Sequence, residues 1–113
     1  MVNNKKVAIY CRVARSDQTA IERQKTVLQG FAEEQGYTNS VCYMDNGFSG
    51  FDYMRTALLQ MQSDISKGQI EAVIVHDIAR IGRSYTHTLE WMHWLGKQGV
   101  ELIIYDQVMA QTA

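Results

Sequence analysis

Four arginines stand at or just after the ends of predicted strands, and their type and spacing suggest chemistry. Arg12 ends the first apolar run, Arg55 follows a glycine-containing loop, and Arg80 and Arg83 follow a third apolar run. A guanidinium fork matches two phosphate oxygens and stays charged at any working pH. Arginines that converge on one point repel one another unless an anion lies between them. The four therefore predict a phosphate site for phosphoryl transfer, although their spacing also fits surface arginines paired with nearby aspartates.

Other phosphate and metal chemistries find less support. The sequence has no GxxxxGK[ST] loop and no GxGxxG after the first strand, so a P-loop and a dinucleotide fingerprint are excluded. His76 and Asp77 stand together at a strand end, but no second ligand cluster accompanies them, and we expect no metal site. An α/β phosphoryl-transfer enzyme that uses Asp45 and Asp77 with Mg²⁺ stays open as an alternative.

The apolar pattern predicts the elements that position these groups. Short β-rich runs cover Val7 to Val13, Ser40 to Met44, Ala72 to Val75 and Val100 to Tyr105. Segments of helical spacing separate them: from Asp17 or Thr19 to Gly36, from about Met54 to Gly68, and from Tyr85 to about Gly99. This order predicts a three-layer α/β fold, with a mostly parallel sheet of four or five strands and helices on both faces. In such sheets the working residues collect at the carboxyl ends of the strands.

Two apolar stripes at helical spacing mark the second and third helices. They are Met54, Leu58, Met61 and Ile65 in the second helix, and Tyr85, Leu89, Met92 and Leu95 in the third. Trp91 and Trp94 share the third helix, and we expect core packing or subunit contact from them rather than base stacking. Cys11 and Cys42 are expected to be reduced thiols in strands.

Composition limits the partners. The chain has 113 residues, suited to one domain, and a formal net charge of −1. A stand-alone DNA-binding domain is usually basic, so any binding to DNA is expected to come mainly from another part of a longer protein. No apolar stretch approaches the roughly 20 residues that span a bilayer. We expect a cytoplasmic protein without a membrane segment.

Several short motifs occur in one order along the chain. They are AIYCRV (Ala8 to Val13), IERQ (Ile21 to Gln24), GY (Gly36 and Tyr37), DNGFSG (Asp45 to Gly50) followed by Arg55, and VIVHDIARIGRSY (Val73 to Tyr85). Together they resemble the N-terminal catalytic domain of serine site-specific recombinases, the resolvase/invertase family, and particularly its larger mobile-element members. The resemblance runs from about Lys6 to Tyr105.

The resemblance implies a resolvase-like fold and DNA strand cleavage and exchange through a phosphoserine intermediate, with no metal and no other cofactor. The residues that it implies bind and polarise the scissile phosphate are Arg12, Arg55, Arg80 and Arg83. Gln18 would line the pocket, and Ser49 would contact DNA or orient Arg55. The implied partners are a DNA recombination site and further copies of the chain, as a dimer or tetramer of the full-length protein.

Ala14 departs from the family at the nucleophile position, where a serine is expected. Alanine has no hydroxyl to attack a phosphodiester, so the chain as given is predicted to be inactive. A displaced nucleophile is the alternative. Ser16 is the nearest hydroxyl and otherwise a DNA-contacting residue, but a shift of even ~1 Å can cost about 10²-fold in rate. A domain kept for assembly or regulation is the remaining explanation.

Further departures are Arg15, Thr56 and Ala79, which stand where the family commonly has threonine, proline and an acid. Residues 1–105 are expected to form the catalytic domain. Residues 106–113 are expected to be a loose tail or the stub of a longer element, cut before the interface helix and the DNA-binding domain.

Overall fold

The computed structural model describes residues 5–112, with side chains through residue 111. Residues 1–4 and 113 lie outside the described part, and with them the last residue of the expected tail. The elements are β1 (Lys6–Val13), α1 (Gln18–Glu34), β2 (Ser40–Asn46), α2 (Thr56–Ser66), β3 (Ile70–Val75), the 3₁₀ helix η1 (Ile78–Arg80), α3 (Tyr85–Lys97), β4 (Glu101–Ile104) and α4 (Tyr105–Thr112).

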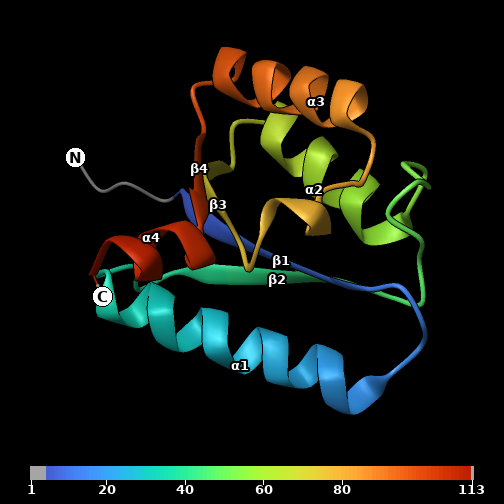
Figure 1. The fold of residues 1–113 in the computed structure, drawn as a ribbon. Coiled ribbons are helices and arrows are strands. Elements are labelled where there is room, and N and C mark those ends of the chain that lie inside the picture. The colour runs from blue at the N-terminus through green and yellow to red at the C-terminus, as the bar shows by residue number, and fades with distance from the viewer. Residues whose placement is uncertain (1–4, 113) are drawn as a thin grey trace.

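The four strands form one parallel sheet in the order β2-β1-β3-β4. Helices α2 and α3 cover one face, and α1 and α4 cover the other (Figure 1). The predicted three-layer α/β architecture is therefore confirmed, with four strands in the described residues. The order reverses between β1 and β3, and in open α/β sheets such a switch point leaves a crevice at the carboxyl ends of the two strands.

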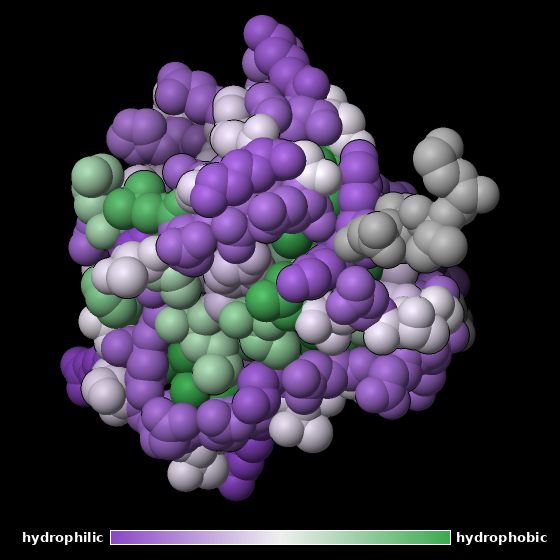
Figure 2. Space-filling model, turned by 180° about the vertical axis from the view of Figure 1, so that it is seen from behind, coloured by the Kyte–Doolittle hydropathy of each residue, from purple (hydrophilic) through white to green (hydrophobic). Residues whose placement is uncertain are grey.

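Each face of the sheet has its own apolar core. Tyr10 and Val73 face α2 and α3, while Ile9 and Ile74 face α1. Central parallel strands are buried on both faces, which explains why β1 and β3 read as continuous apolar runs. Figure 2 shows that apolar residues also reach the surface in patches between hydrophilic ones on the face turned away in Figure 1.

Helix α1 begins where its cap predicts. The Asp17 side chain accepts a hydrogen bond from the Ala20 N–H at 3.0 Å, which satisfies one free amide of the first turn. Leu28 and Phe31 point into the core, and the helix ends before Gly36, whose φ of +89° favours glycine.

The second helix begins later than predicted. Arg55 is extended at the N-cap, so Met54, which the stripe placed at the start of the helix, lies before it and is 75% exposed. The reason is local, because the Met54 N–H donates to the Asp52 carboxylate in a turn that precedes the helix. Leu58, Met61 and Ile65, the rest of the predicted stripe, are buried.

The third helix forms as predicted, and Leu95 is the member of its apolar stripe that is buried. Tyr85 and Leu89 are exposed, whereas Trp91 is buried and its indole N–H donates to the Gln62 amide oxygen at 2.9 Å. The inward positions include a polar one, Thr88, whose hydroxyl donates to the Gly82 carbonyl. A search for apolar periodicity alone passes over such a position.

The segment after β4 is a helix and not a loose tail. Val108 and Met109 of α4 pack against the core on the α1 side of the sheet. Tyr105, predicted to end the fourth strand, instead begins α4, and its ring meets the Phe31 ring edge-on at 5.3 Å. Among the helices of residues 5–112, none is long and apolar enough to cross a membrane. Both cysteines are free thiols, as expected.

Replacing Leu28 by alanine tests the packing of α1. Leu28 is fully buried, whereas its neighbour Val27 is 42% exposed. We expect L28A to lower the free energy of unfolding by about 2–5 kcal/mol, because it leaves a cavity, and V27A to change it by less than about 1 kcal/mol. Urea denaturation measures both, and equal losses would contradict this packing.

Candidate functional site

The switch point of the sheet brings together three of the four predicted arginines. Arg12 lies near the end of β1, directly beside Asp45 on β2, and Arg80 lies in η1 just past β3. Arg55 enters from the N-terminus of α2. Their convergence follows from parallel strands, whose carboxyl ends meet at one edge of the sheet.

Arg12 is buried, and its guanidinium binds backbone carbonyls. It is 1% exposed and donates to Arg80 O at 3.1 Å, Phe48 O at 2.9 Å and Ala79 O at 2.6 Å. Burial lowers the pKa of Arg12, and the positive charge of Arg55 lowers it further. Arg12 therefore joins the loop after β2 to the turn after β3.

Arg55 is completely buried and binds the same turn. It donates to Arg80 O at 2.8 Å, to Ile81 O, and to Asp52 O at 2.5 Å. A further bond runs to the Tyr10 hydroxyl at 2.8 Å. The carbonyl of Arg80 thus accepts from both buried guanidiniums. These two bonds hold the backbone of Arg80, the third arginine, in place.

Asp45 supplies the buried negative charge of the site. One carboxylate oxygen accepts from the Ala57 N–H at 2.8 Å, and the other from the Leu58 N–H at 3.0 Å and the Tyr10 hydroxyl at 2.6 Å. It therefore does for α2 what an N-cap side chain does, and the Arg55 cap residue makes no such bond. Burial, and then the hydrogen bond to Asp45, raise the pKa of Tyr10.

Arg80 and Arg83 are the more accessible cations of the site. The Arg80 guanidinium donates to Arg12 O at 3.0 Å, and its Nε lies 3.3 Å from the Asp77 carboxylate. Arg83 is exposed, and its backbone N–H donates to Gly50 O at 2.9 Å. A Cβ on Gly50 would lie 2.6 Å from Arg83 Cγ and 3.1 Å from Arg12 Nη2, so only glycine allows this close approach.

Gln24 is a residue of the site to which the sequence gave no role, although it lies in the IERQ motif. It is buried on α1, accepts from the Arg12 N–H at 3.1 Å and donates to Arg12 O at 3.2 Å. The next carbonyl, Val13 O, accepts from the N–H groups of Gly47 and Phe48 at 2.9 and 3.1 Å. The backbone is therefore held on both sides where β1 ends. Besides the motif, the sequence signal for Gln24 is that it is a polar residue among the inward positions of α1.

Ala14 follows this fixed end of β1 in an exposed bend. The role of position 14 as the nucleophile position stays a prediction. Ser16 lies two residues further on, exposed, with its backbone near Gly47, whose φ is +91°.

Gln18 and Ser49 are also exposed, and both are engaged locally. Gln18 donates to Glu22 at 2.9 Å and accepts from the Asn46 amide at 3.3 Å. The Ser49 hydroxyl accepts from the Phe51 N–H at 3.1 Å, which shapes the loop. Neither side chain has a bond to Arg55 among those described.

The geometry gives no support to a magnesium site built on Asp45 and Asp77. Both oxygens of Asp45 are occupied by hydrogen bonds within the core. Within residues 5–112 the one possible group of metal ligands is His76, Asp77 and Asp106, which does not include Asp45.

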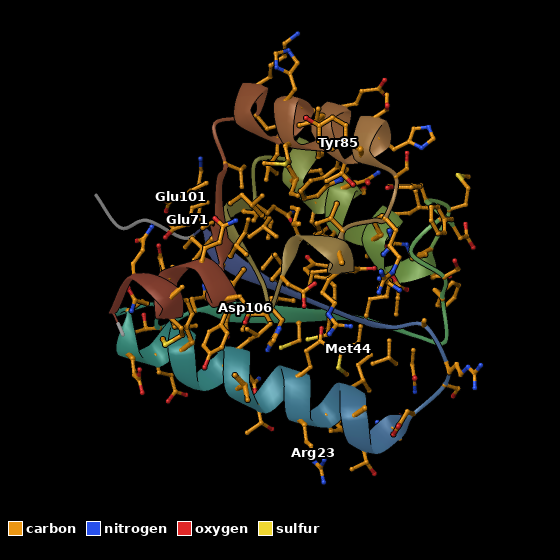
Figure 3. The ribbon with its side chains drawn as sticks, in the orientation of Figure 1. Arg23, Met44, Glu71, Tyr85, Glu101 and Asp106 are labelled. Atoms are coloured by element: carbon orange, nitrogen blue, oxygen red, sulfur yellow. The ribbon has the colours of Figure 1, made fainter. Side chains whose placement is uncertain are left out.

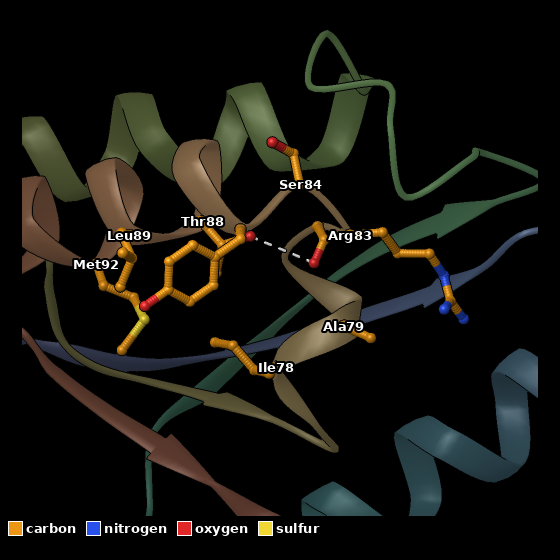
Figure 4. Close-up of a pocket in the computed structure, with 9 residues that line it drawn as sticks. Ile78, Ala79, Arg83, Ser84, Thr88, Leu89 and Met92 are labelled. Carbon is orange, nitrogen blue, oxygen red and sulfur yellow. Dashed lines mark hydrogen bonds between the residues drawn. The ribbon is translucent and has the colours of Figure 1, made fainter.

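A separate hollow of about 360 Å³ lies between η1 and α3 (Figure 4). Ile78, Leu89 and Met92 give it an apolar lining, and the Thr88–Gly82 hydrogen bond closes one side. Tyr85 at its rim is 78% exposed. Figure 3 shows Arg23 on the opposite layer, pointing from α1 away from the sheet.

Comparisons with known proteins agree on one family. The family described as "Resolvase, N terminal domain" matches residues 7–113. The chain belongs to this family. The crystal structure of the N-terminal catalytic domain of TP901-1 integrase superposes with a TM-score of 0.83 at 31% identity, over 91% of this chain and 79% of that one. The resemblance predicted from the motifs is confirmed, as is the resolvase-like fold.

Two further relatives bear this out. A resolvase family site-specific recombinase from Streptococcus pneumoniae gives a TM-score of 0.75 at 29% identity, over 91% of this chain and 73% of that one. A protein of Bacillus subtilis (strain 168) named "Putative DNA recombinase" is 33% identical over 104 residues, which is 88% of this chain. The chain spans 20% of the length of that Bacillus protein.

Replacing Tyr10 by phenylalanine tests the buried network. The change removes one of the two donors to an Asp45 oxygen, which keeps the Leu58 N–H, and it leaves one N–H of Arg55 without an acceptor in the core. We expect Y10F to lower the free energy of unfolding by about 1–3 kcal/mol. The control Y85F removes an exposed hydroxyl and should change it by less than about 0.5 kcal/mol. Equal values for both variants in urea titrations would mean that the network adds no stability.

Proposed function

We propose that this resolvase-family domain is the catalytic domain of a site-specific DNA recombinase, and that with Ala14 it holds the scissile phosphate region without cutting it. The observation that supports this is the convergence of Arg12, Arg55 and Arg80 at the switch point, with Arg83 beside Gly50. By family resemblance the reaction is serine attack on the phosphate, which needs neither metal nor ATP. DNA is the partner, bound through a further part of a longer protein in the cytoplasm.

The two buried arginines and the two accessible ones serve different steps in this proposal. Arg80 and Arg83 are positioned to meet an incoming phosphate first, because they are partly or fully exposed. Arg12 retains donors beyond its three carbonyl bonds, and Arg55 holds the turn that carries Arg80. Positive charge fixed in advance at such a point stabilises a phosphoryl transition state.

Restoring the hydroxyl tests the role assigned to position 14. We expect no covalent protein–DNA adduct from this chain on a suicide substrate. An A14S version fused to a recombinase's own interface helix and DNA-binding part should form the adduct, because β1 already holds position 14 in place. Gel analysis of the adduct measures this. The matched control combines A14S with R80A, which should abolish the adduct, and an adduct formed with Ala14 in place would overturn the proposal.

A second candidate is a recombinase-like module that acts through protein contacts. The exposed Leu89 and Met92 beside the apolar hollow favour it, because contiguous exposed apolar surface often marks an interface. It predicts self-association of the chain, which the recombinase proposal also expects of the full-length protein as a dimer or tetramer.

Replacing Leu89 by glutamate tests this surface. Leu89 is 46% exposed, so the change should leave the fold intact while placing a charge in the apolar patch. We expect L89E to weaken self-association at least about tenfold in sedimentation equilibrium. The control T86E adds the same charge at an exposed polar position of α3 and should have little effect. If both variants associate like the parent chain, this face is no interface.

A further inference from the structure

We propose that His76, Asp77 and Asp106 form a binding site for a borderline divalent transition-metal ion such as Zn²⁺, which joins α4 to the end of β3. The sequence offers only the His76–Asp77 pair, and the fold adds the third group. Each residue presents one ligand atom, and these atoms lie within 4.8 Å of one another. The proposal is independent of the recombinase proposal, since no step of DNA cleavage passes through the site.

Two of the three separations between the ligand atoms suit a small ion. His76 Nδ1 lies 3.2 Å from an oxygen of Asp77 and 3.7 Å from an oxygen of Asp106. For an ion about 2.1 Å from each atom, these separations correspond to angles of about 100° and 125°, which bracket the tetrahedral value. One imidazole and two carboxylates leave a fourth position for water, as in open zinc sites.

The backbone holds the two halves of the site together. The Asp106 N–H donates to the His76 carbonyl at 3.0 Å, so the start of α4 is fixed against the residue that follows β3. Figure 3 shows Asp106 at this end of α4. The His76 ring also packs near the Tyr105 ring, at 5.4 Å between centroids. The ligands therefore come from a framework that needs little rearrangement.

The charges of the site admit a cation. Two carboxylates lie beside His76, and only that of Asp77 is also paired with a guanidinium, that of Arg80. Arg80 Nε lies 3.3 Å from Asp77 but makes no hydrogen bond. It is placed to act as the outer partner that orients a metal-bound carboxylate.

The choice of ion follows from the donors. Imidazole with carboxylate suits zinc and its neighbours in the first transition row, whereas Mg²⁺ and Ca²⁺ prefer oxygen donors alone. Metal bound here would also hold Asp77, and through it Arg80, in one arrangement. Occupancy would thus set the position of an arginine at the phosphate site without taking part in the chemistry.

Metal binding to the untagged chain tests the proposal. We expect one equivalent of Zn²⁺ by titration calorimetry, a visible absorption band with Co²⁺ that Zn²⁺ displaces, and a rise in Tm of about 5 °C or more at a hundredfold excess over Kd. H76A and D106N should each weaken binding by more than the roughly 10- to 100-fold typical of losing an outer partner. The control H93A removes an exposed histidine of α3 and should bind normally.

Three outcomes would overturn the proposal: no saturable binding, binding that H93A weakens as much as H76A, or binding that survives D106N unchanged. D106N guards against a folding artefact, because Asp106 is half exposed and lies outside the core. Circular dichroism of each variant confirms that it is folded. Failure of metal binding leaves the recombinase proposal untouched, because adduct formation is measured without added metal.

Discussion

The carbonyl of Arg80 is the acceptor on which the arrangement of the site depends. Two buried guanidiniums, from β1 and from the start of α2, donate to this one oxygen. Like charges so close repel in a low dielectric, so they stay together only because each also binds other carbonyls and because Asp45 provides a counter-charge through Tyr10. The turn after β3 is therefore held by charge-assisted hydrogen bonds, which are stronger than neutral ones.

This constraint explains features that otherwise look unrelated. A side chain on Gly50 would meet the side chains of both Arg83 and Arg12. Asp45 lies in a strand yet caps a helix, so the start of α2 is tied to the same network as the arginines. Gln24 reaches from the opposite layer to hold the Arg12 backbone. A substitution at any one of these residues would therefore alter the contacts that hold the end of β1.

The sequence predicted the arginine convergence because strand ends of a parallel sheet must meet, and this depends only on topology. The sequence could not predict that the guanidinium groups of Arg12 and Arg55 donate to backbone carbonyls. The direction of a carbonyl in a turn does not follow from a pattern of residue types. Met54 was misplaced for a similar reason. The apolar spacing extended the second helix back to Met54, whereas the helix begins after Arg55, where Asp45 of β2 accepts from an amide of the first turn. Asp106 was missed because its partnership with His76 exists only once α4 has folded back.

The framework that fixes the arginines does not depend on the side chain of Ala14. It runs through the backbone of Arg12 and Val13 and through side chains on other elements, and none of its described bonds uses the side chain at position 14. A serine or an alanine at this exposed position would therefore leave the framework the same described contacts. The arrangement of the arginines and the presence of an attacking group are thus physically separate properties of this fold, and the first can persist without the second.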